Sequence, residues 1–391
     1  MIDFLNKKKE CMGCAACYSI CPQQCITMKA DNEGFYYPIV DEVRCNNCGM
    51  CEKSCPLQHY IEEKTQRTYK GHAYAAYNTD ETIRLQSSSG GIFSLFAQEI
   101  LKKRNGIVFG AAFSSDYQSV WHKAINEEKE IPSLRGSKYV QSNIGECYKE
   151  VKSYLEKGNA VFFSGTPCQI AGLKSYLGKE YIGLYTQDIV CHGVPSPLVW
   201  EKYVRYREQE AKSSVKNIFF RYKKYGWKMF SVLFEFSSDK KYTKSQKEDL
   251  YMRGFLNNIF LRPSCYNCSF KGLEREADIT LADFWGIQTL IPEMDDDKGI
   301  SFVLVNSQKG QTLFNLISNK VCYKETELEP AMTIYNTAAI KSVTKPPNRK
   351  NFMKDLQQQN IEVVLKKYCQ ISTLRKLKVK LRLILLRLKV I

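Results

Sequence analysis

Two kinds of segment alternate along the middle of the chain. Short apolar runs are typical of buried strands, and the segments between them have the 3.6-residue periodicity of amphipathic helices. The apolar runs are residues 72–78, 107–113, 160–165 and 181–190, and the helical segments are 92–106, 166–178 and the second half of 191–209. Strands that alternate with helices form parallel or mixed sheets, so this pattern predicts an α/β arrangement.

Further along, the pattern becomes rich in strands. Apolar stretches recur at 218–226, 230–238 and 300–307, with the segment "ADITLADFWG" between the last two. We therefore expect one α+β or α/β unit with a mixed sheet over about residues 73–345. The polar, aperiodic segment 58–72 ahead of it is typical of a linker.

Two cysteine motifs of identical spacing lie near the N-terminus. The stretches "CMGCAACYSICP" and "CNNCGMCEKSCP" both have the spacing C-x-x-C-x-x-C-x-x-x-C-P. Three thiolates at this spacing can wrap around one cubic iron–sulfur cluster, whereas the fourth cannot reach the same cube. In two-cluster bacterial ferredoxins the fourth cysteine of each motif binds the other cluster. The doubled motif predicts a ferredoxin-type domain with two [4Fe-4S] clusters over residues 1–57.

This crossed arrangement defines two sets of four cysteines. The first cysteine set is Cys11, Cys14, Cys17 and Cys55, and the second cysteine set is Cys45, Cys48, Cys51 and Cys21. Cys25 is predicted to be a small buried residue without a ligand role. Zinc sites and a disulfide framework are the alternatives. Zinc ribbons use C-x-x-C pairs rather than triplets, and disulfides need an oxidising compartment.

Length and composition agree with more than one domain. A chain of 391 residues with 44% hydrophobic and 12% aromatic residues allows two or three domains with a sizeable core. The opening "MIDFLNKKKE" has no apolar signal-peptide core, and no run of eighteen uncharged apolar residues occurs. We therefore expect a cytoplasmic protein with reduced thiols.

The formal net charge of +16 favours an anionic partner such as nucleic acid, a membrane or an acidic protein. Cysteines that bind metal as thiolates add negative charge that this number omits. No nucleic-acid recognition motif accompanies the charge, so we expect no nucleic-acid partner.

Four further cysteines form a third cysteine set: Cys168, Cys191, Cys265 and Cys268. Cys168 and Cys191 each follow a predicted strand, at the sheet edge where open α/β sheets bind ligands. Cys265 and Cys268 form a C-x-x-C loop that can fold over such an edge. A third [4Fe-4S] cluster is one interpretation. The other is that two of these residues are buried small hydrophobes and the C-x-x-C is a redox pair or half of a zinc site.

The chain ends in a basic, apolar segment. Residues 374–391 contain seven Lys or Arg and no acidic residue, and nearly all the others are Leu, Ile or Val. The spacing predicts an imperfectly amphipathic helix. Such a helix either docks on its own domain or anchors the protein at the inner face of a membrane, because apolar burial and attraction to anionic lipid act together.

Seven segments between Ser87 and Gly310 form an ordered set: "SSSGGIFSLF", "RGSKYVQS", "FFSGTPCQIAGLK", "DIVCHGVPSP", "CYNCSFKG", "ADITLADFWG" and "DDDKGISFVLVNSQKG". With the cysteine motifs, they resemble the beta subunit of coenzyme F420 hydrogenase and formate dehydrogenase, in its bacterial form fused to a two-cluster ferredoxin. The resemblance implies a flavin-binding region at 73–150, a C-terminal region at 151–345 and a basic helical tail at 346–391.

The resemblance also implies cofactors and their binding residues. It favours the third cluster and an FAD next to it. The flavin would be lined by Ser87, Ser88, Ser89, Gly90, Gly91, Ser137, Lys138 and Tyr139. A glycine-bearing loop that enters a helix presents free N–H groups to a pyrophosphate, although such loops also serve as plain turns.

Three functional hypotheses follow, and the sequence names no catalytic residue for any of them. The first is an iron–sulfur, flavin-dependent oxidoreductase acting on an organic small molecule, such as a sugar-linked intermediate of polysaccharide biosynthesis. The second is an electron-transfer subunit that couples ferredoxin, another low-potential donor or coenzyme F420 to a partner enzyme. The third is a scaffold whose clusters are structural. Clusters pass single electrons while a flavin stores two, so the two cofactors suit one another.

Overall fold

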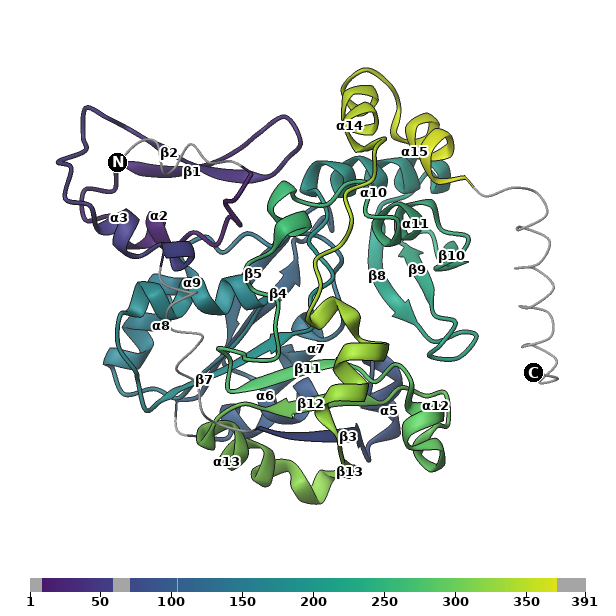
Figure 1. Ribbon diagram of the computed structural model, residues 1–391. Coiled ribbons are helices and arrows are strands. Elements are labelled where there is room, and N and C mark those ends of the chain that lie inside the picture. The colour runs from purple at the N-terminus through teal and green to yellow at the C-terminus, as the bar shows by residue number, and fades with distance from the viewer. Residues whose placement is uncertain (1–8, 59–70, 104, 371–391) are drawn as a thin grey trace.

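A mixed eight-stranded sheet forms the centre of the protein, and the computed structural model describes residues 9–58, 71–103 and 105–370 (Figure 1). The strand order is β13-β3-β12-β11-β7-β6-β4-β5. Strands β11, β7, β6 and β4 run parallel, and the outer strands pair antiparallel. The strands are β3 (His72–Asn78), β4 (Ile107–Phe113), β5 (Val120–Ile125), β6 (Val161–Ser164), β7 (Leu184–Ile189), β11 (Ile279–Asp283), β12 (Ser301–Val305) and β13 (Val321–Thr326). The predicted mixed sheet is confirmed.

Both faces of this sheet are covered, because successive residues of a strand point to opposite faces. Val108 and Phe162 pack with α6 and α13, whereas their neighbours Phe109 and Phe163 pack with α8 and α9. Strand β3 of region 73–150 lies between β13 and β12 of region 151–345, so these two regions share one core. The helices around the sheet are α5 (Glu81–Gln86), α6 (Ile92–Leu101), α7 (Ile131–Leu134), α8 (Cys147–Glu156), α9 (Pro167–Leu177), α12 (Ile287–Leu290) and α13 (Gln308–Ile317).

The helix predicted over 92–106 is shorter than expected. It ends at Leu101, and the chain then turns back toward the sheet. Asn105 adopts a left-handed φ of 56°, and the Gly106 N–H donates to the Lys103 carbonyl at 3.0 Å. The glycine therefore belongs to the turn that leads into β4, not to a helix end.

A second core lies beside the main sheet. It consists of an antiparallel three-stranded sheet and four helices, which surround the fully buried Trp200. These elements are β8 (Val215–Tyr222), β9 (Ser231–Phe236), β10 (Lys241–Ser245), α10 (Pro197–Ala211), α11 (Leu250–Leu256), α14 (Arg349–Gln358) and α15 (Ile361–Cys369). Thus the first part of the 346–391 segment is integral to this core. The predicted basic helix at 374–391 lies outside the described residues. Across the described ranges, no helix combines the length and apolar character needed to cross a membrane.

The N-terminal module is small and sits on α9 (Figure 1). It comprises α2 (Ala16–Ile20), α3 (Met50–Lys53) and an antiparallel hairpin of β1 (Ile26–Ala30) and β2 (Tyr36–Val40). Gly172 of α9 allows the close approach, since a Cβ at this position would lie 2.8 Å from the Cβ of Cys14. The module is thereby fixed directly against the edge of the main domain.

Candidate functional site

The first cysteine set lines one cavity. Cys11, Cys14, Cys17 and Cys55 surround it together with Met12 and Pro38. Left-handed backbone at Gly13 (φ 69°) and Ala15 (φ 65°) turns this loop sharply between the cysteines. Burial and the neighbouring thiols, Cys55 foremost, raise the pKa of Cys14 to about 12. A thiolate at this position therefore requires nearby positive charge, such as that of bound iron.

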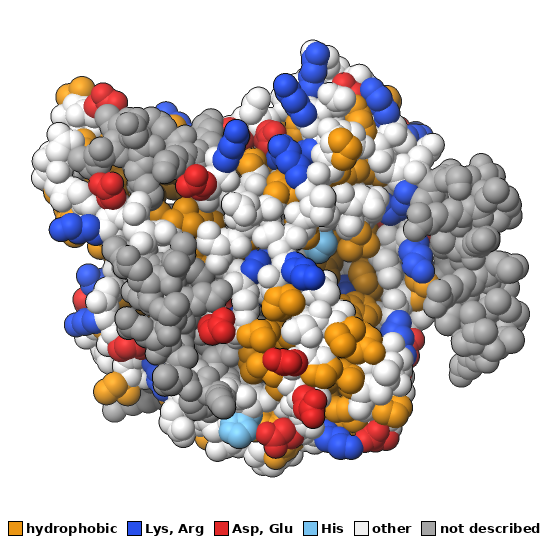
Figure 2. Space-filling model, in the orientation of Figure 1, with side chains coloured by type: hydrophobic (Ala, Val, Ile, Leu, Met, Phe, Trp, Pro, Cys, Tyr) orange, Lys and Arg blue, Asp and Glu red, His pale blue; other side chains and the backbone are white. Residues whose placement is uncertain are grey.

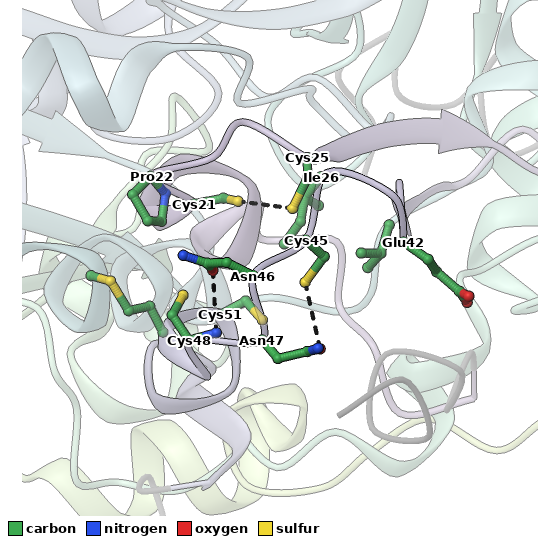
Figure 3. A pocket seen from close by; sticks show the side chains of 12 residues that line it. Cys21, Pro22, Cys25, Ile26, Glu42, Cys45, Asn46, Asn47, Cys48 and Cys51 are labelled. Atoms are coloured by element: carbon green, nitrogen blue, oxygen red, sulfur yellow. Dashed lines mark hydrogen bonds between the residues drawn. The ribbon is translucent and has the colours of Figure 1, made fainter.

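The second cysteine set lines another cavity. Figure 3 shows side chains of Cys21, Cys45, Cys48 and Cys51 around it. Cys25 is buried, as expected, but it also lines this cavity, with its Sγ 3.4 Å from the Sγ of Cys21. Cys48 is exposed. The eight cysteines are thus grouped in the crossed manner, with Cys55 beside the first triplet and Cys21 beside the second.

The third cysteine set lines a third cavity. Cys168 lies in the first turn of α9, Cys191 two residues after β7, and the other two in and directly after a 3-10 turn at Pro263–Asn267. The Val194 N–H donates to the Sγ of Cys265 at 3.4 Å. Burial raises the pKa of Cys265 to about 12. Three chain segments more than twenty residues apart thus bring four partly buried thiols together, a donor set that suits a [4Fe-4S] cluster.

Cationic side chains surround this third cavity. Arg262, Lys271 and Arg275 all line it. The Lys271 Nζ donates to the carbonyl of Cys191, and Arg275 forms a buried ion pair with Asp188 at 3.0 Å. Burial raises the pKa of Cys191, and the positive charges of Lys271 and Arg275 oppose this shift and favour the thiolate. Within residues 9–58, 71–103 and 105–370, no His, Cys, Asp and Glu side chains are grouped closely enough to hold a single metal ion.

The two stretches predicted to line a flavin are in contact with each other. The Ser137 N–H donates to the Ser88 Oγ at 2.7 Å. Gly91, at a φ of 84°, caps the N-terminus of α6. Ser89 donates through its hydroxyl to the Ile300 carbonyl at 2.6 Å, and the Gly90 N–H donates to the Ser301 Oγ at 3.0 Å. The loop is therefore held rigidly where α6 begins.

The other three residues of these stretches are engaged with the protein itself. The Ser87 hydroxyl donates to the Ile83 carbonyl at 2.7 Å. The Lys138 Nζ donates to the carbonyls of Leu134 and Arg135 at 3.0 and 3.1 Å, and burial lowers its pKa to about 7. The Tyr139 ring stacks on Phe255, with centroids 4.7 Å apart. Among the described residues, neither the Lys138 nor the Tyr139 side chain forms a hydrogen bond to the Ser87–Gly91 loop.

Two cations that the sequence did not single out border this loop. Arg135 donates through Nε to the Ser94 Oγ in the first turn of α6, at 3.0 Å. The Lys223 Nζ donates to the Ser89 carbonyl at 2.8 Å. Figure 2 shows a hollow between the β8–β9 hairpin and the main sheet, bordered largely by hydrophobic side chains. The helix N-terminus and these cations together suit an anionic group.

Comparisons with known proteins agree with the geometry. Residues 10–58 match the family "4Fe-4S dicluster domain", and residues 158–331 match the C-terminal domain of the coenzyme F420 hydrogenase/dehydrogenase beta-subunit family. The coenzyme F420-dependent sulfite reductase of Methanocaldococcus jannaschii is 22% identical over 327 residues, which cover 82% of this chain and 48% of that protein. The chain thus spans about half the length of this relative.

Two further similarities are more limited. The VorC subunit of ketoisovalerate oxidoreductase from Methanothermobacter marburgensis is 33% identical over 64 residues, 16% of this chain and 81% of that protein. A chain of the F420-reducing [NiFe] hydrogenase complex from Methanosarcina barkeri aligns with a TM-score of 0.46 and 16% identity, covering 75% of this chain and 90% of that chain.

The cysteine sets and the family match define a protein with an N-terminal domain of the class that binds two [4Fe-4S] clusters. More particularly, the chain joins a 4Fe-4S dicluster domain to a domain of the coenzyme F420 hydrogenase/dehydrogenase beta-subunit family. The resemblance recognised in the sequence is confirmed.

Proposed function

We propose that the protein transfers electrons between the N-terminal clusters and an FAD in the main domain, through a third [4Fe-4S] cluster bound by the third cysteine set. The arrangement of the cavities carries this proposal. Met12 lines both the first and the third cavity. On α9, Cys168 belongs to the third cavity and Gly172 contacts Cys14 of the first. These positions are one helical turn apart, a rise of roughly 6 Å.

Different residues of the chain bind the clusters and the flavin in this proposal. The three cysteine sets hold the clusters and orient them, and the cations around the third cavity stabilise its thiolates. The N-terminus of α6, Ser88 and Arg135 bind the pyrophosphate of FAD, and the hydrophobic hollow excludes water from the flavin ring. When bound, the flavin supplies conversion between one-electron and two-electron chemistry.

The substrate is an organic small molecule such as a sugar-linked intermediate of polysaccharide biosynthesis. The name of the M. jannaschii relative adds coenzyme F420 and sulfite to the compounds worth testing. Coenzyme F420 and an oxidisable or reducible sugar carbon exchange electrons in pairs, as a flavin does. Reduction of sulfite to sulfide needs several such pairs in succession.

A second candidate function is that of an electron-transfer subunit without a substrate of its own. The exposed second cavity favours it: Cys48 is exposed, and the nearby Val43 side chain is 97% exposed. Ferredoxin or another low-potential protein donor can approach this end of the molecule closely.

One experiment separates the two functions. The full-length protein is purified anaerobically, its flavin is identified, and reduced ferredoxin is added. We expect the flavin absorbance to bleach, and then to recover when F420, sulfite or a sugar-linked acceptor is supplied. Recovery with none of these, but with a partner enzyme, would favour the electron-transfer subunit. A protein without flavin would contradict both the FAD site and the relay.

The proposed flavin site predicts that Arg135→Gln weakens FAD binding about tenfold or more, because a charge-assisted hydrogen bond to a phosphate is lost. Iron content should not change. Arg205→Gln, which alters an exposed arginine on α10, is the control. Equilibrium dialysis of FAD measures both variants, and equal affinities would place the pyrophosphate elsewhere.

For the C-terminal segment 374–391, we propose a membrane-surface anchor. Full-length protein should float with anionic liposomes at low salt and less at high salt, and a variant truncated after Gln370 should not, because basic residues and apolar side chains act together. Neutral liposomes provide the control. Equal flotation of the two proteins would show that the segment does not bind the membrane.

A further inference from the structure

Arg262 is a fully buried arginine that joins the N-terminal module to the main domain. Its Nε donates to the Cys11 carbonyl at 2.8 Å, and its Nη2 donates to the Tyr36 carbonyl at 3.0 Å. Its Nη1 donates to the Gln141 side chain at 2.9 Å, and the guanidinium lies 4.3 Å from the centroid of the Tyr37 ring. No carboxylate is among these partners, and the positive charge is met by carbonyl and amide dipoles and by the Phe35 and Tyr37 rings.

The same guanidinium lies between two cysteine sets. Its Nη2 is 3.7 Å from the Sγ of Cys11, a member of the first set. Arg262 also lines the third cavity, and its carbonyl accepts from the Cys265 N–H at 3.0 Å in the turn that presents this cysteine. Its positive charge opposes the effect of burial on the pKa of Cys265, which burial raises. Gly13 leaves room for it, because a Cβ there would lie 2.8 Å from the Arg262 Nη1. One buried charge thus faces the occupants of two neighbouring cavities.

A cubic cluster gains one electron on reduction, and its reduced form is therefore more negative by one charge. A fixed positive charge and an N–H donor near a ligand sulfur stabilise that form and raise the reduction potential. Burial strengthens the effect, since little water screens the charge.

We propose that Arg262 is a positioning residue that raises the reduction potentials of both clusters flanking it, those held by the first and third cysteine sets. The second cysteine set lies outside its reach and is unaffected. By acting on both neighbours at once, Arg262 keeps their potentials close to each other. The part of the proposal that concerns the third cysteine set rests on the proposed function, whereas the part that concerns the first does not.

Arg349 provides a matched control. It is also a buried arginine that joins the two parts of the molecule, donating through Nη1 to Glu33 at 2.9 Å and through Nη2 to the Leu261 carbonyl at 2.8 Å. It lines none of the three cysteine cavities. Loss of Arg349 therefore removes a docking contact without removing a charge beside a cluster.

The test is an anaerobic redox titration of the full-length protein followed by electron paramagnetic resonance. In Arg262→Gln, the midpoint potentials of the clusters held by the first and third cysteine sets should fall. That of the cluster held by the second cysteine set should stay unchanged. In Arg262→Lys, which keeps the charge, the two potentials should fall less. In Arg349→Gln, all three should equal those of the unaltered protein.

Three results would overturn the proposal: unchanged potentials in Arg262→Gln, a shift of all three clusters, or the same shift in Arg349→Gln. If both Arg262 variants lose clusters while Arg349→Gln keeps them, Arg262 is a structural residue and the proposal also fails. Iron analysis distinguishes this result from the case in which the third cysteine set holds no cluster in the unaltered protein. A protein with about eight iron atoms lacks that cluster, and a single falling potential would then still support the effect of Arg262 on the first.

Discussion

Replacing Cys265 and Cys268 together by alanine should lower the iron content of the anaerobically purified protein from about twelve to about eight atoms per chain, because one cubic cluster is lost. Reduction of the flavin by ferredoxin should be abolished, since the proposed electron route passes through the third cluster. Iron and sulfide analysis, with flavin bleaching, measures both effects.

Cys322→Ala is the matched control for this pair. Cys322 is an exposed cysteine on the edge strand β13 and lines none of the three cysteine cavities. Its variant should keep about twelve iron atoms. If the unaltered protein holds only eight, or if the double variant keeps twelve, the third cysteine set does not bind a cluster.

Arg275→Met should lower the free energy of unfolding by about 3–5 kcal/mol, because it leaves the Asp188 carboxylate buried without its partner. Asp188 and Arg275 are 1% and 2% exposed. Burial raises the pKa of Asp188, and Arg275 is the main group that opposes this shift. Urea unfolding followed by tryptophan fluorescence under anaerobic conditions measures the loss.

Two further variants complete this experiment. Adding Asp188→Asn to Arg275→Met should recover part of the lost stability, because the unpaired charge is removed. Arg205→Met breaks the exposed ion pair with Glu201 and should cost less than about 1 kcal/mol. A loss as small as this in Arg275→Met would show that the buried pair contributes little.

Much of the sheet could be predicted because its strands are continuous apolar runs. The predicted strands 72–78 and 107–113 coincide with β3 and β4. Strand β13 was missed because it lies at the sheet edge, where four of its six residues are exposed and no apolar run remains. The turn at Asn105 and Gly106 was taken for helix because the apolar periodicity does not report a left-handed backbone conformation.

The grouping of the cysteines could be predicted because the spacing itself limits which thiols meet. The cations around them could not. Arg262 contacts Cys11 across 251 positions, and the only local sign is that it shortly precedes the C-x-x-C pair. Arg135 lies beside the "GSKY" stretch, but its contact with Ser94 depends on how α6 and α7 pack. Such contacts are set by the tertiary fold and leave no periodic trace in the sequence.

The third cysteine set also constrains the order in which the protein can mature during synthesis. The eight cysteines of the first and second cysteine sets are complete once residue 55 has left the ribosome, so both of these sites can be loaded early. The third site needs Cys168, Cys191 and the pair at 265 and 268, which come from separate segments and meet only at the edge of the folded sheet. A cluster at this site would therefore be assembled only after the main domain has folded, so the last cluster acquired would be the one in the middle of the proposed route.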